Sequence, residues 1–241
     1  MAEAQKQPFA VFDIDGTLIR WQLYHAIADE LAKANLIDAE TFNGIRSARM
    51  QWKRREHAQA FKDYEMQLVM AYDKLLRSIS PNQLEKAADA VFEEYKDQTY
   101  TYTRQLITDL KAKNYLLFAI SGSQQEVIAQ IAQHYGFDDF IGSHFVRKNG
   151  RFTGEKISPV FDKEAALKTL VERHGLSYGG SIGIGDSHSD IALLTSVEQP
   201  IAFNPEDRLF AYARQHGWDI IVERKNVIYE LKADDGKYIL A

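Results

Sequence analysis

The segment Phe9–Ile14 most constrains the fold, because an apolar run there leads into two carboxylates, Asp13 and Asp15, followed by Gly16. If the segment is a strand, this spacing places both carboxylates on one face. Two like charges about 4 Å apart repel by roughly 4 kcal/mol at an effective dielectric near 20. The end of a buried strand would therefore carry the pair only beside a cation, with a shared proton, or with both. The alternative is a turn with solvated carboxylates, which an isolated Asp-x-Asp-Gly favours.

A second apolar run, Ser181–Gly185, also ends at a carboxylate, Asp186, and Asp190 follows at the expected start of a helix. Open parallel sheets bind ligands beyond the carboxyl ends of their strands. Asp13, Asp15 and Asp186 would meet there if the two strands were neighbours. Three oxygen ligands without an evident His pairing suit Mg²⁺, which uses few protein carboxylates and completes its coordination with water and phosphate.

The chain contains two kinds of sequence. Between about residues 20 and 98 it is rich in Ala, Gln, Glu and Lys, which predicts several amphipathic helices. On either side, strands alternate with helices, which predicts a parallel sheet covered by helices, with the helical block inserted after the first strand. Beyond that block, strands are expected at Tyr115–Ser121, Ser181–Gly185, Pro200–Asn204 and finally Trp218–Val222, helices at Gln124–Tyr135, Asp162–His174 and Pro205–His216, and a hairpin turn at Lys148–Arg151.

Composition excludes several classes of protein. No cysteine is present, so disulfides, thiolate catalysis and Cys-based metal sites are impossible. The 29 basic and 34 acidic side chains give a net charge of −5, which argues against a protein that covers nucleic acid with positive charge. The longest apolar run, Tyr115–Ile120, is too short to span a membrane, and Met1–Pro8 lacks the apolar core of a signal peptide. We therefore expect a soluble, cytoplasmic protein with no nucleic-acid or membrane partner. The sequence does not indicate whether the protein is a monomer or an oligomer.

Two further segments carry groups that could meet an anion. Ser121-Gly122-Ser123 follows an expected strand and precedes a helix, whose N-terminal N–H groups favour a negative charge. Ser123 could also simply cap that helix. Lys163 lies in the first turn of a later helix, where the helix dipole disfavours a cation. Such a lysine is most often a surface residue, and Lys156 is a rival for the same role.

Four motifs, taken in order, resemble those of the haloacid dehalogenase-like (HAD) phosphatases. Each motif is weak alone, whereas the ordered set is specific and covers the core from end to end. The resemblance implies an α/β fold with a Rossmann-like doubly wound parallel sheet, formed by residues 1–19 and 99–241, and a helical cap formed by residues 20–98. Within the family, the phosphoserine phosphatases are the most similar branch. The four motifs are Asp13-Ile14-Asp15-Gly16-Thr17-Leu18, Ser121-Gly122, Lys163, and Gly185-Asp186 with Asp190.

The resemblance also implies a role for each matching residue. Asp13 would be the nucleophile that takes the phosphoryl group, and Asp15 would protonate the leaving alcohol and then deprotonate the attacking water. Mg²⁺ would be held by Asp13, the backbone carbonyl of Asp15, and Asp186. Asp190 would orient the water ligands of the metal. The remaining implied residues are the phosphate ligands Ser121, Gly122 and Lys163 and the supporting residue Thr17.

The residues that would recognise the rest of the substrate are less defined. Phosphoserine phosphatases carry a Glu shortly after the first motif, whereas the matching position here looks like Gln22, preceded by Arg20 and Trp21. Gln cannot pair with an ammonium as a carboxylate does, which disfavours phosphoserine without excluding it. In the helical block, Arg49 and Lys53 fall on one helical face that could grip an anionic substrate. A solvated face balanced by neighbouring acids is the favoured alternative.

The sequence thus predicts a Mg²⁺-dependent phosphatase that hydrolyses a small-molecule phosphate monoester through an aspartyl-phosphate intermediate. A phosphotransferase or phosphomutase on the same site is an alternative that no sequence feature decides. A non-catalytic module that binds phosphorylated ligands is another, although the intact Asp pair, Lys163 and Asp186 argue against it. A dinucleotide-binding oxidoreductase is weaker still, because His188 occupies the third glycine position after Gly183 and Gly185.

Overall fold

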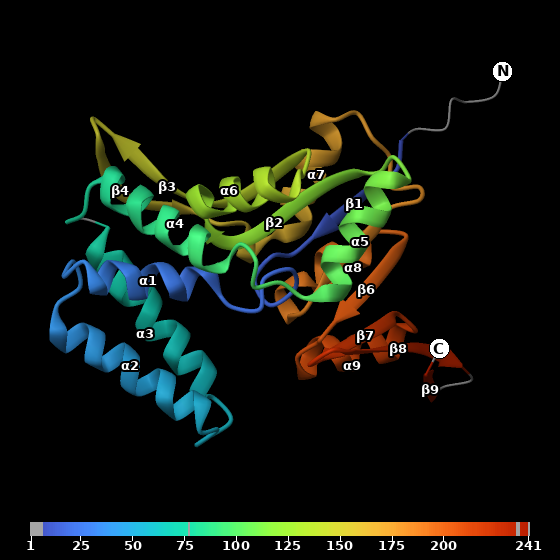
Figure 1. The fold of residues 1–241 in the computed structure, drawn as a ribbon, viewed down its shortest axis with the longest axis horizontal. Helices are drawn as coiled ribbons and strands as arrows, with labels where there is room; N and C mark the ends of the chain where they lie inside the picture. Colours follow the sequence, from blue (N-terminus) through green and yellow to red (C-terminus); the bar gives the residue numbers. More distant parts are fainter. Residues whose placement is uncertain (1–6, 77, 235–236, 241) are drawn as a thin grey trace.

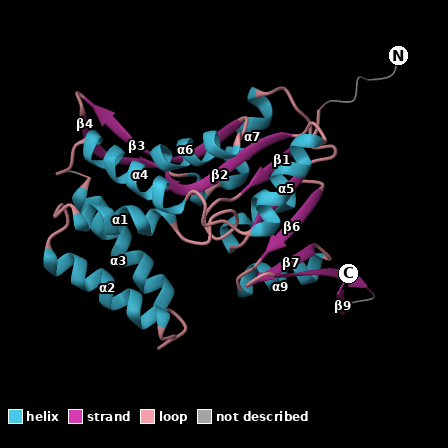
Figure 2. Cartoon of the chain, viewed as in Figure 1, coloured by secondary structure: helices cyan, strands magenta, loops and turns pink. Residues whose placement is uncertain are grey.

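A nine-stranded sheet runs through the computed structural model, which describes residues 7–76, 78–234 and 237–240. The strands are β1 (Phe9–Phe12), β2 (Leu116–Gln124), β3 (Asp139–Lys148), β4 (Arg151–Ile157), β5 (Ile182–Gly185), β6 (Gln199–Phe203), β7 (Asp219–Arg224), β8 (Val227–Asp234) and β9 (Lys237–Leu240). Their order is β4-β3-β2-β1-β5-β6-β7-β8-β9 (Figures 1 and 2). The strands from β3 to β7 in this order are parallel, whereas β4, β8 and β9 pair antiparallel. The predicted α/β fold with a parallel sheet is therefore confirmed.

Helices cover both faces of the sheet. They are α1 (Leu23–Lys33), α2 (Ala39–Lys53), α3 (Ala60–Leu75), α4 (Pro81–Tyr95), α5 (Thr101–Ala112), α6 (Gln125–Tyr135), α7 (Lys163–Arg173), α8 (Ile191–Ser196) and α9 (Asp207–His216), with short 3₁₀ turns η1 (Pro159–Phe161) and η2 (His188–Asp190). None of the described helices is long and apolar enough to cross a membrane.

Strand β1 lies inside the sheet, between β2 and β5, and divides the core into two layers. Phe9 and Val11 pack in a cluster with residues of α7, α8 and α9, whereas Ala10 and Phe12 pack with residues of α1, α4, α5 and α6. This alternation follows from the period-two geometry of a strand that is covered on both faces. All four side chains are fully buried, and burial of a large apolar side chain contributes about 1.5–3 kcal/mol. The buried β1 therefore holds the residues that follow it in a fixed place.

The four helices between β1 and α5 differ in how they contact the sheet. Helices α1 and α4 pack on each other, α1 contacts β2, and α4 contacts α6. Arg147 of β3 reinforces this docking, because its guanidinium pairs with Glu85 of α4 at 2.8 Å and with Glu126 of α6. Helices α2 and α3 pack mainly on each other and project from the rest of the molecule (Figure 1). One buried cluster nevertheless continues from the inserted helices into the sheet.

Local sequence signals account for several element ends. Helix α4 begins with a reciprocal pair of hydrogen bonds between Ser80 and Gln83, with Pro81 at its first position, where the missing N–H of proline costs nothing. The predicted hairpin joins β3 and β4, and its turn residues Asn149 and Gly150 have φ of 51° and 73°. A two-residue hairpin turn needs positive φ at both positions, which Asn-Gly tolerates at low cost. The hairpin prediction is confirmed.

The structure corrects two expected strand ends. Strand β2 continues to Gln124 rather than stopping at Ser121. Trp218–Val222 is not the final strand, because β8 and β9 follow β7 as antiparallel additions. The side chains of β8 are exposed except for the half-buried Leu231. Apolar and polar residues nevertheless alternate from Tyr229 to Asp234, so this strand carries a local sequence signal. The turn before β8 uses Lys225 at φ 57°, which is not a recognisable turn signal.

Candidate active site

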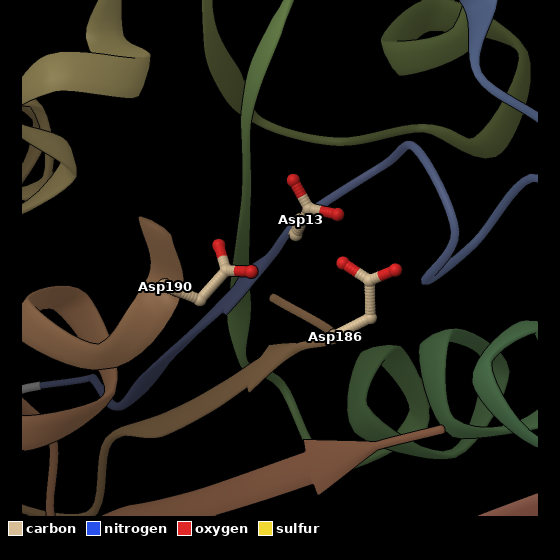
Figure 3. Close-up of side chains that lie close together, drawn as sticks. All are labelled: Asp13, Asp186 and Asp190. Atoms are coloured by element: carbon tan, nitrogen blue, oxygen red, sulfur yellow. The ribbon is translucent and has the colours of Figure 1, made fainter. Parts of the chain in front are cut away.

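Three carboxylates converge at the carboxyl ends of β1 and β5. Asp13 follows β1, Asp186 follows β5, and Asp190 ends η2 (Figure 3). One oxygen from each lies within 4.8 Å of the other two. Because β1 and β5 are hydrogen-bonded neighbours, these segments meet although they are far apart in the sequence. Asp13 and Asp190 are buried, and Asp186 is half-buried.

Lys163, the first residue of α7, lies against this cluster. Its Nζ donates hydrogen bonds of 2.6 Å to Asp13 Oδ1 and to Asp190 Oδ1, and the residue is buried. The two carboxylates thus offset the unfavourable position of a cation at a helix N-terminus. Burial alone would lower the pKa of Lys163, but the adjacent charges of Asp13 and Asp190 outweigh it and raise the pKa. The rival Lys156 lies elsewhere, with its Nζ 5.9 Å from the ring centroid of Tyr24.

The cluster carries more negative than positive charge. Burial raises the pKa of Asp13 to about 7, although the nearby Lys163 ammonium opposes the shift. The pKa of Asp186 is raised well above its usual range by burial and by the charges of Asp13 and Asp190. Asp13 Oδ2 is buried and accepts no hydrogen bond from any described residue. An added cation would relieve each of these costs.

The donor set fits a hard divalent cation. Every candidate ligand is a carboxylate oxygen, which is what Mg²⁺ prefers. Gly16, with φ of 83°, leaves room beside the cluster, because a Cβ there would lie 2.1 Å from Asp186 Oδ2. The sequence assigns Asp190 to orienting metal-bound water, whereas the structure places its carboxylate in the same group as Asp13 and Asp186.

The carboxylate of Asp15 points to a different set of partners. Its Oδ2 accepts a hydrogen bond from Ser121 Oγ at 2.5 Å, and its Oδ1 accepts from Ser123 Oγ at 3.0 Å and from the Leu23 N–H at 2.5 Å. Burial raises the pKa of Asp15, and these three donors oppose that shift. Thr17 is buried, and its carbonyl accepts a hydrogen bond from Thr103.

Gly122 lies near the end of β2 and faces Val160 of η1. A Cβ at this position would lie 3.4 Å from Val160 Cβ. Its carbonyl accepts a 2.6 Å hydrogen bond from Ser143 Oγ. The structure therefore holds the Ser121-Gly122 segment from two sides and presents it next to Asp15.

The substrate-recognition candidates have separate surroundings. Gln22 lies beside the Gly16 turn, with its Nε2 3.4 Å from where a Gly16 Cβ would be. Arg20 donates a 2.5 Å hydrogen bond to Glu223 of β7, and Lys53 lies 5.4 Å from the ring centroid of Trp21. A bidentate pair joins Arg49 to Asp29, with both distances 2.8 Å, and the Arg49 Nε donates to Tyr64. Arg20 and Arg49 are therefore engaged by other protein side chains.

Two contacts near the cluster were missed by the sequence analysis. Ser123 was considered as a cap for the following helix, yet α6 receives no side-chain cap, and the Ser123 hydroxyl contacts Asp15 instead. Ser121 and Ser123 share one face only if the strand continues, and that continuation depends on pairing with β3, which the sequence does not show. In addition, Glu206 Oε1 accepts a 2.6 Å hydrogen bond from the His188 N–H, and it lies 2.6 Å from the His188 ring nitrogen Nδ1. The loop that carries Asp186 and Asp190 is thereby held to the segment after β6.

The parallel sheet, with an acidic cluster and a buried lysine at the carboxyl ends of its strands, defines an α/β protein with its candidate site at the usual edge of such a sheet. The chain belongs to the haloacid dehalogenase-like hydrolases, whose family model matches residues 10–195. Several of the relatives it matches are named phosphatases.

Individual relatives agree over most of the chain. Histidinol-phosphatase from Neisseria meningitidis is 27% identical over 220 residues, which cover 88% of this chain and 97% of that protein. Phosphoserine phosphatase from Methanocaldococcus jannaschii is 22% identical over 234 residues, covering 95% and 98%. A solved phosphoserine phosphatase with an analogue of its phospho-aspartyl intermediate has a TM-score of 0.62 at 19% identity, covering 92% and 96%. The last comparison shows a shared fold.

Proposed function

We propose that this protein is a Mg²⁺-dependent phosphatase that hydrolyses a small-molecule phosphate monoester through an aspartyl-phosphate on Asp13. The main support is the pair of hydrogen bonds by which Lys163 bridges Asp13 and Asp190 beside Asp186. This arrangement keeps one oxygen of Asp13 fixed, while Oδ2 has no partner among the described residues. A nucleophile needs such an oriented and otherwise uncommitted oxygen.

The proposed metal site consists of Asp13, Asp186 and the backbone carbonyl of Asp15, with Asp190 adjacent. When bound, Mg²⁺ would neutralise part of the charge of the phosphate and of the carboxylates, so that an anionic nucleophile can approach an anionic ester. Lys163 contributes a further positive charge on the same side.

The reaction then has two steps that use this chain's own groups. An Asp13 oxygen attacks phosphorus, the bond from phosphorus to the ester oxygen breaks, and Asp15 donates a proton to the leaving alcohol. In the second step, Asp15 takes a proton from water as that water attacks the phosphorus, which releases phosphate and restores Asp13. Ser121 and the Gly122 N–H would bind the phosphate oxygens that do not react.

We also propose that residues 20–98 act as a cap over a catalytic core formed by residues 1–19 and 99–241. The Leu23 N–H at the start of α1 contacts Asp15 directly, so the inserted helices reach the reacting groups. A cap of this kind excludes water and favours small substrates. The relatives named for histidinol phosphate and phosphoserine support a small phosphorylated metabolite, and Gln22 beside the Gly16 turn disfavours phosphoserine.

The test is hydrolysis of p-nitrophenyl phosphate by the wild-type protein and by Asp13→Asn. We expect Asp13→Asn to lower kcat by roughly four orders of magnitude or more, because it removes the nucleophile. The matched control is Asp109→Asn, an exposed aspartate of α5, which should leave kcat unchanged. EDTA should abolish wild-type activity and Mg²⁺ should restore it. Turnover by Asp13→Asn, or indifference to EDTA, would refute the proposal. If both expectations hold, a panel that includes histidinol phosphate and phosphoserine would define the substrate.

A further inference from the structure

The N-terminus of α1 is capped by residues of the sheet rather than by its own sequence. The residue before the helix, Gln22, makes no side-chain capping hydrogen bond. Instead, the Leu23 N–H donates to Asp15 Oδ1 at 2.5 Å, and the Tyr24 N–H donates to Ser123 Oγ at 2.8 Å. The first N–H groups of a helix need such acceptors. Here they are supplied by the proposed general acid and by a serine 99 positions further along the chain.

The Ser123 hydroxyl uses both of its hydrogen-bonding functions at this junction. It accepts from the Tyr24 N–H and donates its single proton to Asp15 Oδ1 at 3.0 Å. The Ser123 N–H also donates to Ser121 Oγ at 2.9 Å, and that hydroxyl donates to Asp15 Oδ2 at 2.5 Å. The Ser123 hydroxyl therefore acts directly on one oxygen of Asp15, whereas the backbone N–H of residue 123, which alanine would keep, supports the Ser121 hydroxyl at the other. Ser123 is 1% exposed, so water does not replace these contacts.

We propose that Ser123 is a positioning residue for Asp15, holding its carboxylate in the orientation for proton transfer while the first turn of α1 is docked on the sheet. The inference rests on the proposed role of Asp15 as general acid. Without the Ser123 hydroxyl, Asp15 Oδ1 keeps only the Leu23 N–H and Oδ2 keeps the Ser121 hydroxyl, so the carboxylate loses one of its three donors and is held less firmly. Proton transfer to a poor leaving group then becomes slower, whereas a good leaving group, which departs without a proton, is little affected.

The experiment compares kcat/KM for phenyl phosphate and p-nitrophenyl phosphate, two probes of similar shape whose phenols differ in leaving ability. Ser123→Ala should lower kcat/KM for phenyl phosphate about tenfold and for p-nitrophenyl phosphate less than threefold. The ratio of the two values on one preparation does not depend on the fraction of folded enzyme. Ser123→Thr keeps a hydroxyl and should restore the wild-type ratio.

The matched control is Ser181→Ala. Ser181 is fully buried, its hydroxyl donates to the Tyr178 carbonyl at 2.5 Å, and it accepts from the Glu198 N–H at 3.0 Å. It thus has the same kind of contacts as Ser123 but lies just before the amino end of β5, away from Asp15. Ser181→Ala should change both kcat/KM values by the same factor.

A double-mutant cycle completes the test. Adding Ser123→Ala to Asp15→Asn should leave the ratio of the two kcat/KM values unchanged, because the acid that Ser123 positions is already absent. An equal loss on both probes in Ser123→Ala, or a further change in the double variant, would overturn the positioning role. If the wild-type protein hydrolyses neither probe, the proposed phosphatase activity itself fails, which is a distinct outcome.

Discussion

Two clusters of the molecule each place one cation against oxygen acceptors, but they differ in span and in charge. At the strand ends, Lys163 joins Asp13 and Asp190, which are 150 and 27 positions away in the chain. In the inserted helices, Arg49 joins Asp29 and the Tyr64 hydroxyl, which are 20 and 15 positions away. The first cluster is assembled by the sheet topology, whereas the second is assembled by packing between neighbouring helices.

The difference in charge separates a site that needs a ligand from one that does not. The Arg49 cluster is balanced, with one guanidinium against one carboxylate. The strand-end cluster sets three carboxylates, those of Asp13, Asp186 and Asp190, against one ammonium. Its excess of two negative charges, when all groups are ionised, is what a divalent cation would neutralise. The net negative charge of the strand-end cluster, which the Arg49 cluster lacks, therefore distinguishes the candidate metal site from a structural ion pair.

The largest loss of stability is expected from Lys163→Met, which removes the cation of the strand-end cluster. Removing the ammonium leaves Asp13 and Asp190 buried without their partner, and breaking such a pair costs about 3–5 kcal/mol. Urea unfolding at pH 8 in EDTA should show this loss, and Mg²⁺ should recover part of it. Lys168→Met, on an exposed lysine of the same helix, is the control and should change the free energy of unfolding by less than about 0.5 kcal/mol. Equal stability of the two variants would contradict the electrostatic role of Lys163.

A smaller effect is expected in the inserted helices from Arg49→Met. The ion pair with Asp29 is partly exposed, so solvent weakens its hydrogen bonds, and we expect the free energy of unfolding to fall by about 2 kcal/mol in total. Because the guanidinium already bonds Asp29 and Tyr64, kcat/KM for p-nitrophenyl phosphate should change less than about threefold. The comparison is Arg54→Met, an exposed arginine that pairs with Glu56 at 3.4 Å. A large rise in KM specific to Arg49→Met would instead support the substrate-gripping interpretation of this helical face.

The last effect is a pH dependence that arises at His25 and is small near neutral pH. Burial, together with the charge of Arg49, lowers the pKa of this histidine to about 3. Below pH 6.5 the unfolded chain binds a proton at His25 that the folded protein does not bind, so stability falls as pH falls toward 3. At pH 5 the loss amounts to about 2 kcal/mol.

The measurement is the free energy of unfolding between pH 7 and 5 for wild type and His25→Gln in saturating Mg²⁺. The wild-type slope should exceed that of His25→Gln, whatever the absolute stability of the variant. His57→Gln, on an exposed histidine of the same insert, should keep the wild-type slope. Parallel curves for wild type and His25→Gln would show that His25 titrates normally in the folded protein.

The parallel core was predictable because its signals are local. Apolar runs that end in small or acidic residues located β1 and β5, and Asn149-Gly150 marked the hairpin. Strand β8 was also predictable, because apolar and polar residues alternate from Tyr229 to Asp234, whereas the four residues of β9 are too few to show a pattern. The extension of β2 to Gln124 depends on pairing with β3, which is a tertiary contact.

The residues of the candidate site also differ in how far the sequence predicts their contacts. The meeting of Asp13 with Asp186 follows from the general position of ligands in parallel sheets, and the ordered motifs distinguished Lys163 from Lys156. Which partner occupies Arg49, or which helix Ser123 caps, depends on side-chain packing between segments that the sequence does not pair. A cation on a helical face offers no local clue to whether a protein carboxylate such as Asp29 already neutralises it.

The place of β1 inside the sheet has a consequence for how the chain reaches this structure. Its two neighbours in the sheet begin at Leu116 and Ile182, so during synthesis on the ribosome β1 emerges long before either of them. Helices α1 to α4 can form meanwhile from contacts near in sequence, whereas closing the sheet requires contacts between distant segments and is the slower event. Until then, the apolar Phe9–Phe12 strand exposes both edges, and a chaperone that shields it would raise the yield of native enzyme.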